Sequence, residues 1–111
     1  MKLGNRYRLY TISQHTTLEV DNLIEDCMNF LHTITFDKET SGKFLKVKQK
    51  LCQTEELENL DIIYKRKKEI LFQDIFDILE SISPEGSYFG THPKNLSLIG
   101  FWDENLFSIT R

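Results

Sequence analysis

The hydrophobic positions in the first third of the chain repeat with the period of an amphipathic helix. Intervals of four, three, four and three residues separate Val20, Ile24, Cys27, Leu31 and Ile34. Such intervals place side chains on one face of an α-helix. Ahead of them, Thr16 stands three residues before Glu19, the spacing of a capping box, in which a hydroxyl and a carboxylate satisfy free amide donors. The pattern predicts a helix behind this cap.

A second helical pattern runs from Thr54 to Ile82 without a proline or a glycine. Its hydrophobic stripe, interrupted around Lys67 and Lys68, consists of Leu57, Leu60, Tyr64, Leu71, Ile75, Ile78 and Ile82. Thr54, followed by two glutamates, is the predicted N-cap, and Pro84 with Gly86 predicts the end. A helix of this length measures about 42 Å, at about 1.5 Å per residue, and is expected to bend or break at the lysines.

The segment between these two helices is less clear in its pattern. Residues 37–42, DKETSG, have the composition of a polar turn. Residues 43–51, KFLKVKQKL, match both a helical face and the alternation of a strand. Their content of lysine, glutamine and leucine favours the helix.

Strand patterns lie at both ends of the chain. Residues 6–13, RYRLYTIS, are rich in aromatic and β-branched residues. Three short candidates follow the long helix, at residues 87–91, 97–102 and 106–110. Sequential strands with short connections usually pair, and so small a sheet needs a helix to cover it. The predicted fold is α+β: two to three helices, one of them long, packed on a small antiparallel β-meander formed mainly by the C-terminus.

Composition indicates one ordinary domain, residues 1–111. Hydrophobic residues make up 40% of the chain, enough for one core. The net charge of −3 argues against generic binding to nucleic acid. No apolar run approaches the roughly 20 residues that span a bilayer, and the start has no apolar stretch typical of a signal peptide. We therefore expect a cytoplasmic protein without membrane contact, with Cys27 and Cys52 as buried, reduced thiols.

Known catalytic and metal-binding motifs are missing. No zinc-type spacing joins any two of the candidate ligands, which are His15, His32, His92, Cys27 and Cys52. Neither a nucleophile elbow nor a phosphate-binding glycine loop occurs. The sequence thus predicts no catalytic residue, no metal ligand and no cofactor, and favours a protein that is not an enzyme. The enzymatic alternative is a small enzyme that uses His92 with an acid such as Asp74 or Glu85.

The aromatic C-terminal segment is the main candidate for binding a partner protein. Glycines 86, 90 and 100 lie among its candidate binding residues, which are Tyr88, Phe89, His92, Phe101 and Trp102. Aromatic side chains are favoured at interfaces, but the same residues could form the core between sheet and helix. Strand alternation places Tyr88 and Phe89 on opposite faces, and likewise Phe101 and Trp102. One member of each pair is therefore expected to be exposed, unless a further layer covers it.

Two charged groups give further hypotheses. Nucleic acid could bind the basic segments 43–50 and 65–68 through Lys46, Lys50, Lys65, Arg66 and Lys68; a solvated surface is the simpler interpretation. Asp74, Asp77 and Glu80 recur every three residues near a helix C-terminus, where the helix dipole disfavours negative charge. They indicate either a cation or basic partner, or a solvated face. The long helix could also serve a homodimer.

The pattern Pro-Glu-Gly-x-Tyr-Phe-Gly-x-His-Pro, followed by Gly-Phe-Trp, resembles a motif in small uncharacterised proteins of phages and conjugative elements. It covers residues 84–102, under a fifth of the chain. Those proteins tend to carry a Gly-Asp-Gly type loop after His-Pro, where this chain has Lys94, Asn95 and Leu96. The resemblance implies a mobile-element accessory protein. The leading hypothesis is a small non-enzymatic protein-binding module that inhibits or modulates a host factor such as a defence nuclease, in the manner of an anti-CRISPR protein.

Overall fold

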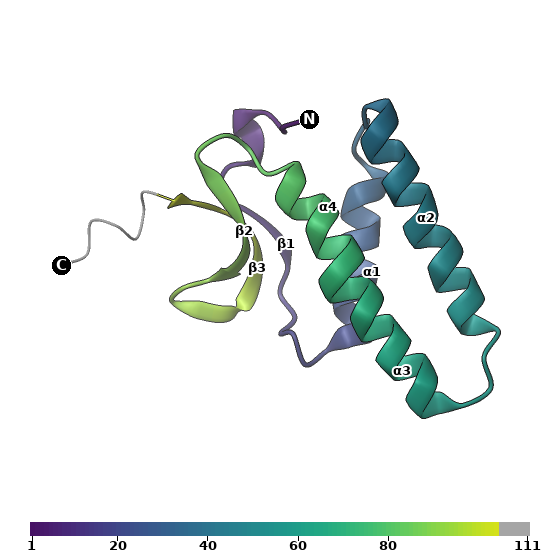
Figure 1. Ribbon diagram of the computed structural model, residues 1–111. Coiled ribbons are helices and arrows are strands. Elements are labelled where there is room, and N and C mark those ends of the chain that lie inside the picture. Colours follow the sequence, from purple (N-terminus) through teal and green to yellow (C-terminus); the bar gives the residue numbers. More distant parts are fainter. Residues whose placement is uncertain (105–111) are drawn as a thin grey trace.

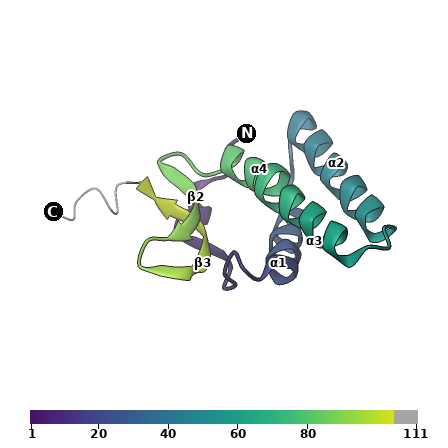
Figure 2. The same ribbon diagram turned by 60° about the horizontal axis from the view of Figure 1, so that its bottom comes forward.

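The computed structural model describes residues 1–104 and confirms an α+β fold (Figure 1). After a short 3-10 turn, Asn5–Tyr7, come β1 (Tyr10–Ser13), α1 (Val20–His32) and α2 (Lys38–Glu55). One long helix follows, made of α3 (Leu60–Glu69), a π-helical segment (Ile70–Ile75) and α4 (Phe76–Ser81). The chain then forms the hairpin of β2 (Ser87–His92) and β3 (Asn95–Asp103). In Figures 1 and 2, the long helix lies between the sheet and α2.

The sheet has three antiparallel strands in the order β1-β3-β2. The predicted hairpin is confirmed, with Phe89 opposite Phe101 and Gly90 opposite Gly100. The predicted N-terminal strand also joins the sheet, but it begins at Tyr10, because Asn5–Tyr7 coil into the 3-10 turn. The third predicted C-terminal strand, residues 106–110, lies outside the described residues. Among the described strands β3 is therefore central, and β2 lies at an edge.

The core lies where α1 and the long helix meet the inner face of the sheet. Its fully buried side chains include Leu23, Cys27 and Leu31 from α1, and Ile99 and Phe101 from β3. The long helix adds Leu71, Ile75 and Ile78, and Ile82 directly after it is buried too, which confirms the C-terminal half of the predicted stripe. Burying a large aliphatic side chain stabilises a fold by about 1.5–3 kcal/mol. Packing of α1 and the long helix against β3 therefore holds the sheet in place.

Two helix starts differ from their predictions. The Glu19 carboxylate does accept a hydrogen bond from the Thr16 amide, at 2.9 Å, but the pair closes a turn ahead of the helix, which begins at Val20. Residues 37–42 are not a turn. Asp37 accepts from the Thr40 amide at 2.9 Å and caps α2, so the polar run is a helix start and residues 43–51 are helical.

The N-cap of the long helix is Asn59 and not Thr54. The Asn59 side chain accepts hydrogen bonds from the amides of Asp61 and Ile62, at 2.9 and 3.1 Å. Thr54 is instead buried in the last turn of α2, where its hydroxyl donates to the Lys50 carbonyl at 2.8 Å. The two helices are thus separate, joined by a short turn at one end of the molecule.

The π-helical segment shifts the hydrophobic stripe from one face of the long helix to another. The Phe76 amide donates to the Leu71 carbonyl, five residues back, so this segment holds more residues per turn than an α-helix. Leu71 and the later stripe positions, Ile75, Ile78 and Ile82, are buried in the core, but α3 has no buried residue. Leu60 is 79% exposed and Tyr64 48%. The predicted stripe is therefore correct from Leu71 onward and wrong before it, where the half-buried Ile63 and Lys67 are the less exposed positions.

Candidate binding groove

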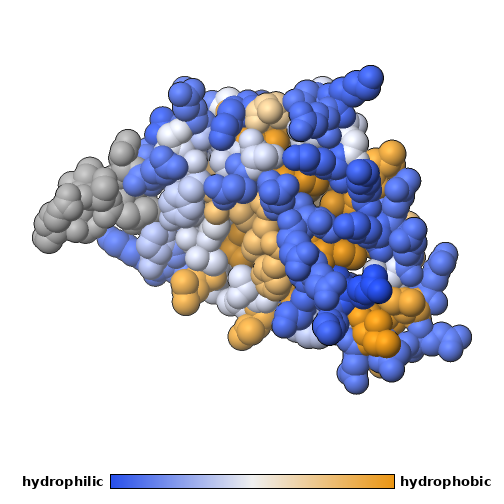
Figure 3. Space-filling model, viewed as in Figure 1, coloured by the Kyte–Doolittle hydropathy of each residue, from blue (hydrophilic) through white to orange (hydrophobic). Residues whose placement is uncertain are grey.

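A shallow groove of about 340 Å³ lies between the long helix and β2. Figure 3 shows a hydrophobic strip in this region, with hydrophilic side chains beside it. The π-helical segment, α4 and the edge strand β2 supply the side chains that line it. These lining residues are Phe72, Gln73, Phe76, Asp77, Glu80, Phe89 and Gly90. We refer to it as the aromatic groove.

Phenylalanine rings packed edge-to-face form the floor of this groove. Phe72 packs edge-to-face on Phe76 with ring centroids 5.3 Å apart, and Phe76 packs on Phe89 at 4.8 Å. Phe89 continues to Phe101 in the core at 6.0 Å. Edge-to-face pairs of this kind each contribute about 0.5–1.5 kcal/mol beyond area burial. The floor is thus tied to the core, whereas Phe72, at its outer end, is 37% exposed.

Carboxylates line one side of the aromatic groove. Asp77 and Glu80 are exposed, and neither makes an ion pair with another described residue. The third acid of the predicted group, Asp74, lies in a different groove and accepts from Lys50 at 2.9 Å. Asp77 also lines the hollow that contains Lys43 and Lys46, without an ion pair to either, so Asp77 and Glu80 both remain unpaired beside the apolar floor.

The five predicted partner-binding residues divide between the two faces of the sheet. Phe89 lies in the groove floor and Phe101 is fully buried in the core. Tyr88 is half-buried, and burial raises the pKa of its hydroxyl. The Trp102 indole donates to the Gly90 carbonyl at 2.8 Å, and the half-buried His92 ring packs against Trp102 at 4.8 Å.

These positions correct one expectation and show what the sequence missed. Trp102 is only 4% exposed, so neither member of the Phe101 and Trp102 pair is exposed. Phe72 and Phe76, by contrast, belong to the groove although the hydrophobic stripe did not include them. Their spacing of four residues places them together on a helix. That spacing is the one signal in the sequence that marks them.

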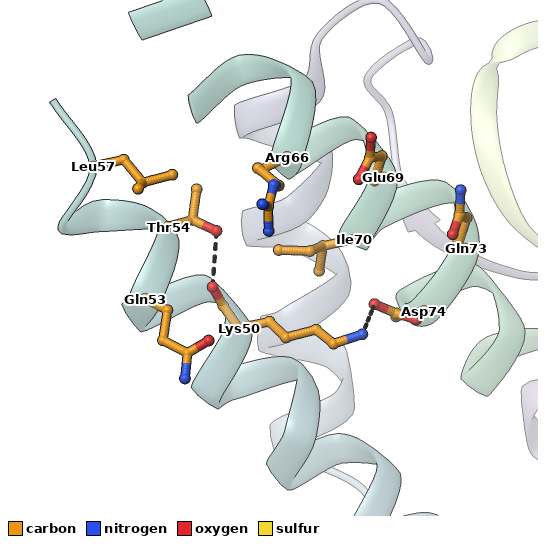
Figure 4. A pocket seen from close by; sticks show the side chains of 9 residues that line it. All are labelled: Lys50, Gln53, Thr54, Leu57, Arg66, Glu69, Ile70, Gln73 and Asp74. Carbon is orange, nitrogen blue, oxygen red and sulfur yellow. Dashed lines mark hydrogen bonds and ion pairs between the residues drawn. The ribbon is translucent and has the colours of Figure 1, made fainter. Parts of the chain in front are cut away.

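The predicted nucleic-acid-binding residues do not form one surface. Lys50 and Arg66 line a groove of about 300 Å³ between α2 and the long helix (Figure 4). Lys46 lines the hollow beside it. Lys65 and Lys68 line neither, and the Lys68 ammonium lies 5.5 Å from the Tyr64 ring centroid. Asp74 and Glu69 stand in the same groove as Lys50, so this surface carries both signs of charge.

The residues of the enzymatic alternative lie in different surroundings. The His92 Nδ1 accepts from the Lys94 amide at 3.1 Å, whereas Asp74 binds Lys50. Within residues 1–104, no three His, Cys, Asp or Glu side chains are grouped so that they could hold a metal ion.

Both cysteines are free. Cys27 is buried, as expected, and burial raises the pKa of its thiol to about 12. Cys52 is exposed on α2, which corrects the expectation that both thiols are buried. The two thiols differ in exposure because Cys27 lies on the core-facing side of α1, whereas Cys52 lies on the side of α2 that faces away from buried Val47 and toward solvent.

Comparison with known proteins leaves function to be argued from this geometry. No family model matches the chain, and neither a curated protein nor a solved structure matches it. The resemblance of residues 84–102 to phage and conjugative-element proteins stays a prediction. Among the helices of the described part of the chain, none combines the length and the hydrophobicity that crossing a membrane requires.

Proposed function

We propose that this chain is a non-enzymatic protein-binding module, and that its aromatic groove takes up a basic segment of a partner protein. The observation that carries the proposal is one juxtaposition. An exposed phenylalanine, Phe72, stands over a packed aromatic floor, beside two carboxylates that form no ion pair with another described residue. An apolar side chain of the partner would pack on Phe72, while its lysines or arginines meet Asp77 and Glu80.

Physical chemistry supports this assignment of roles. Aromatic anchors surrounded by polar residues supply much of the affinity of protein interfaces, and charge complementarity supplies specificity and speed of association. The two carboxylates also lie near a helix C-terminus, where the dipole disfavours them by a few tenths of a kcal/mol each. A cationic partner relieves that cost when it binds.

A host factor such as a defence nuclease is the partner that we propose on the resemblance of residues 84–102. A nuclease must hold phosphates, so its substrate channel is rich in lysine and arginine. Such a surface matches the acidic side of the aromatic groove. An inhibitor that covers it would need no catalytic residue of its own.

Affinity capture with the full chain tests the proposal. Wild-type protein, Phe72→Ser, and the pair Asp77→Lys with Glu80→Lys serve as baits in lysate of the native host. We expect a protein to be captured by the wild type and lost from both groove variants, while their melting curves stay close to wild type. Leu96→Ser is the control, because Leu96 is also an exposed apolar side chain but lies beside the hairpin turn, outside the groove. Equal capture by all four baits would contradict the groove assignment.

A titration of labelled duplex and single-stranded nucleic acid at two salt concentrations tests the alternative function. Binding at low salt that falls steeply as salt rises, and that Lys50→Glu and Arg66→Glu abolish, would assign the chain to nucleic acid. We expect no binding at either concentration, because acids share the groove of these two cations.

A further inference from the structure

Strand β2 forms an open edge of the sheet. The order β1-β3-β2 gives β2 a single partner among the described strands, which is β3. At the start of this pairing, the Gly86 carbonyl accepts from the Glu104 amide at 3.0 Å, in register with the pairs that follow. In an antiparallel pair, residues that bond to the partner strand alternate with residues that do not. The even-numbered residues of β2 therefore bond toward β3, and the backbone groups of Phe89 and Thr91 point outward.

These outward groups are open to another strand. Within residues 1–104, no backbone group outside the sheet bonds to the main chain of Phe89 or Thr91. Proteins commonly protect such an edge with lysine, proline or a bulge. Residues 87–91, SYFGT, contain neither lysine nor proline, and their register with β3 is regular up to Thr91. The edge is thus suited to pair with an additional strand.

The aromatic groove lies along this same edge. Phe89 and Gly90 of β2 line one side of it, and the long helix lines the other side with Phe72, Asp77 and Glu80 among its residues. Phe72 is 37% exposed, and the two exposed acids make no ion pair with another described residue. An aromatic side chain and two carboxylates therefore stand beside the open backbone groups.

We propose that the basic segment of the partner binds in extended form, as an additional strand paired with β2. This inference rests on the proposed function, because it specifies how the aromatic groove holds its partner. The outward amides and carbonyls of Phe89 and Thr91 would form the backbone hydrogen bonds, which supply affinity in this mode of recognition, while side-chain pockets supply specificity. Every second side chain of the added strand would face the groove.

The lengths of helix and strand set the spacing of the partner's side chains. Phe72 and Glu80 lie about 12 Å apart along the helix, at about 1.5 Å per residue. An extended segment covers that distance in about four residues, at about 3.3 Å per residue. We expect an apolar side chain over Phe72, with lysine or arginine two and four positions away, opposite Asp77 and Glu80.

A second copy of this chain fits the edge less well. Pairing β2 with β2 of another copy would bring the two grooves together at a two-fold axis. The Asp77 and Glu80 carboxylates of both copies would then lie near one another, and such like charges repel. A partner strand that carries lysine or arginine has no such conflict.

An NMR titration of the full chain with a designed peptide tests the pairing. The probe is the capped peptide Thr-Phe-Thr-Lys-Thr-Lys-Thr, which has the expected spacing on one face. We expect the amides of Phe89 and Thr91 to shift and to exchange more slowly with solvent, because they become hydrogen-bonded. The amides of Tyr88 and Gly90 already bond toward β3 and should keep their exchange rates. A probe with glutamate in place of lysine should not bind.

Two N-methylated versions of the probe form a matched pair, one methylated on its phenylalanine and lysines and the other on its threonines. The amides of a strand point alternately to either side, so only one of the two sets faces β2. That version should bind at least about tenfold more weakly than the other. Equal binding of the two versions would overturn the strand pairing.

The variant Phe72→Ser separates this inference from the proposed function. Suppose the probe shifts groove residues of the wild type and not of Phe72→Ser, yet Phe89 and Thr91 exchange as in the free protein. The groove then binds its partner without strand pairing, so this inference fails and the proposed function stands. No shift at any groove residue with millimolar probe would overturn both. Protection of the Phe89 and Thr91 amides that rises with the concentration of the protein alone would assign the edge to a second copy and overturn the inference.

Discussion

Gly100 lies where β1 passes closest to β3. A Cβ atom at this position would stand 2.0 Å from the Tyr10 carbonyl oxygen and 3.0 Å from the Thr11 Cα. The register of the two strands shifts between Thr11 and Ser13, which is the irregularity of a bulge. Glycine inside a strand commonly marks such a close approach. The N-terminal strand can therefore pair with β3 only because residue 100 has no side chain.

Replacing Gly100 with alanine is expected to destabilise the protein by about 3 kcal/mol or more, since the obstacle is backbone that cannot move aside. Urea denaturation measures the free energy of unfolding. Gly90→Ala is the control, because a Cβ there would meet only the Tyr88 ring, at 3.6 Å, which is an ordinary contact. It should cost less than about 1 kcal/mol. Equal costs at the two glycines would show that β1 does not approach β3 so closely.

At the scale of the secondary-structure element, the start of the long helix depends on one capping side chain, Asn59. Asn59→Ala removes the acceptor for the Asp61 and Ile62 amides, and we expect a loss of about 1 kcal/mol. Asn59→Asp should stay within a few tenths of a kcal/mol of wild type, because aspartate caps equally well. Hydrogen exchange at the two amides, together with urea denaturation, checks both. If hydrogen exchange at these two amides were unchanged in Asn59→Ala, a residue other than Asn59 would be the cap.

Sequence periodicity identified which segments are helical more reliably than where they begin. Thr54 and Asn59 are both good N-caps followed by acids, so local chemistry does not choose between them. The choice is made by tertiary structure, since Thr54 is buried against the long helix in α2. The extra residue of the π-helical segment has no such local signal. A fixed period of 3.6 residues consequently places Leu60 and Tyr64 on the same stripe as Leu71, whereas the structure leaves both exposed.

The aromatic groove was predictable in part for the same reason. Phe89 could be named from strand composition, and the acids Asp77 and Glu80 from their unfavourable position on the helix. Their meeting with Phe72 and Phe76 depends on β2 lying beside α4, a contact between elements that no local pattern encodes. The sheet order was likewise only partly predictable, because the strand that joins β3 on its other side comes from the far end of the chain.

At the scale of the whole molecule, two carboxylates link folding to pH. The Thr16 backbone amide and the His15 side chain hold the pKa of Glu19 below its ordinary 4.5. Hydrogen bonds from Thr40 hold the pKa of Asp37 below its ordinary 3.8. In the unfolded chain both groups bind protons at a higher pH than in the folded chain. Their contribution to stability is therefore complete above these ordinary values and is lost as pH falls through the lowered folded values.

Urea denaturation across a pH series measures this link. We expect the free energy of unfolding to fall as the pH drops below about 4.5, with Glu19 first and Asp37 next. The double variant Glu19→Gln with Asp37→Asn should show a shallower fall, since neither substituted group titrates. If wild type and variant fall in parallel, other carboxylates are responsible for the acid sensitivity.

The two cysteines allow the cooperativity of the whole fold to be measured. Cys52 is exposed and should react with a thiol reagent at once at neutral pH. Cys27 is fully buried, and the rise of its pKa from 9.0 to about 12 lowers its thiolate fraction about a thousandfold, so its reaction must await unfolding. In a Cys52→Ser variant, we expect the reaction rate of Cys27 to rise with urea in step with the unfolded fraction. Cys27 lies on α1 and packs into the core. If its reaction rate rose before global unfolding, α1 would open separately and the domain would not be a single cooperative unit.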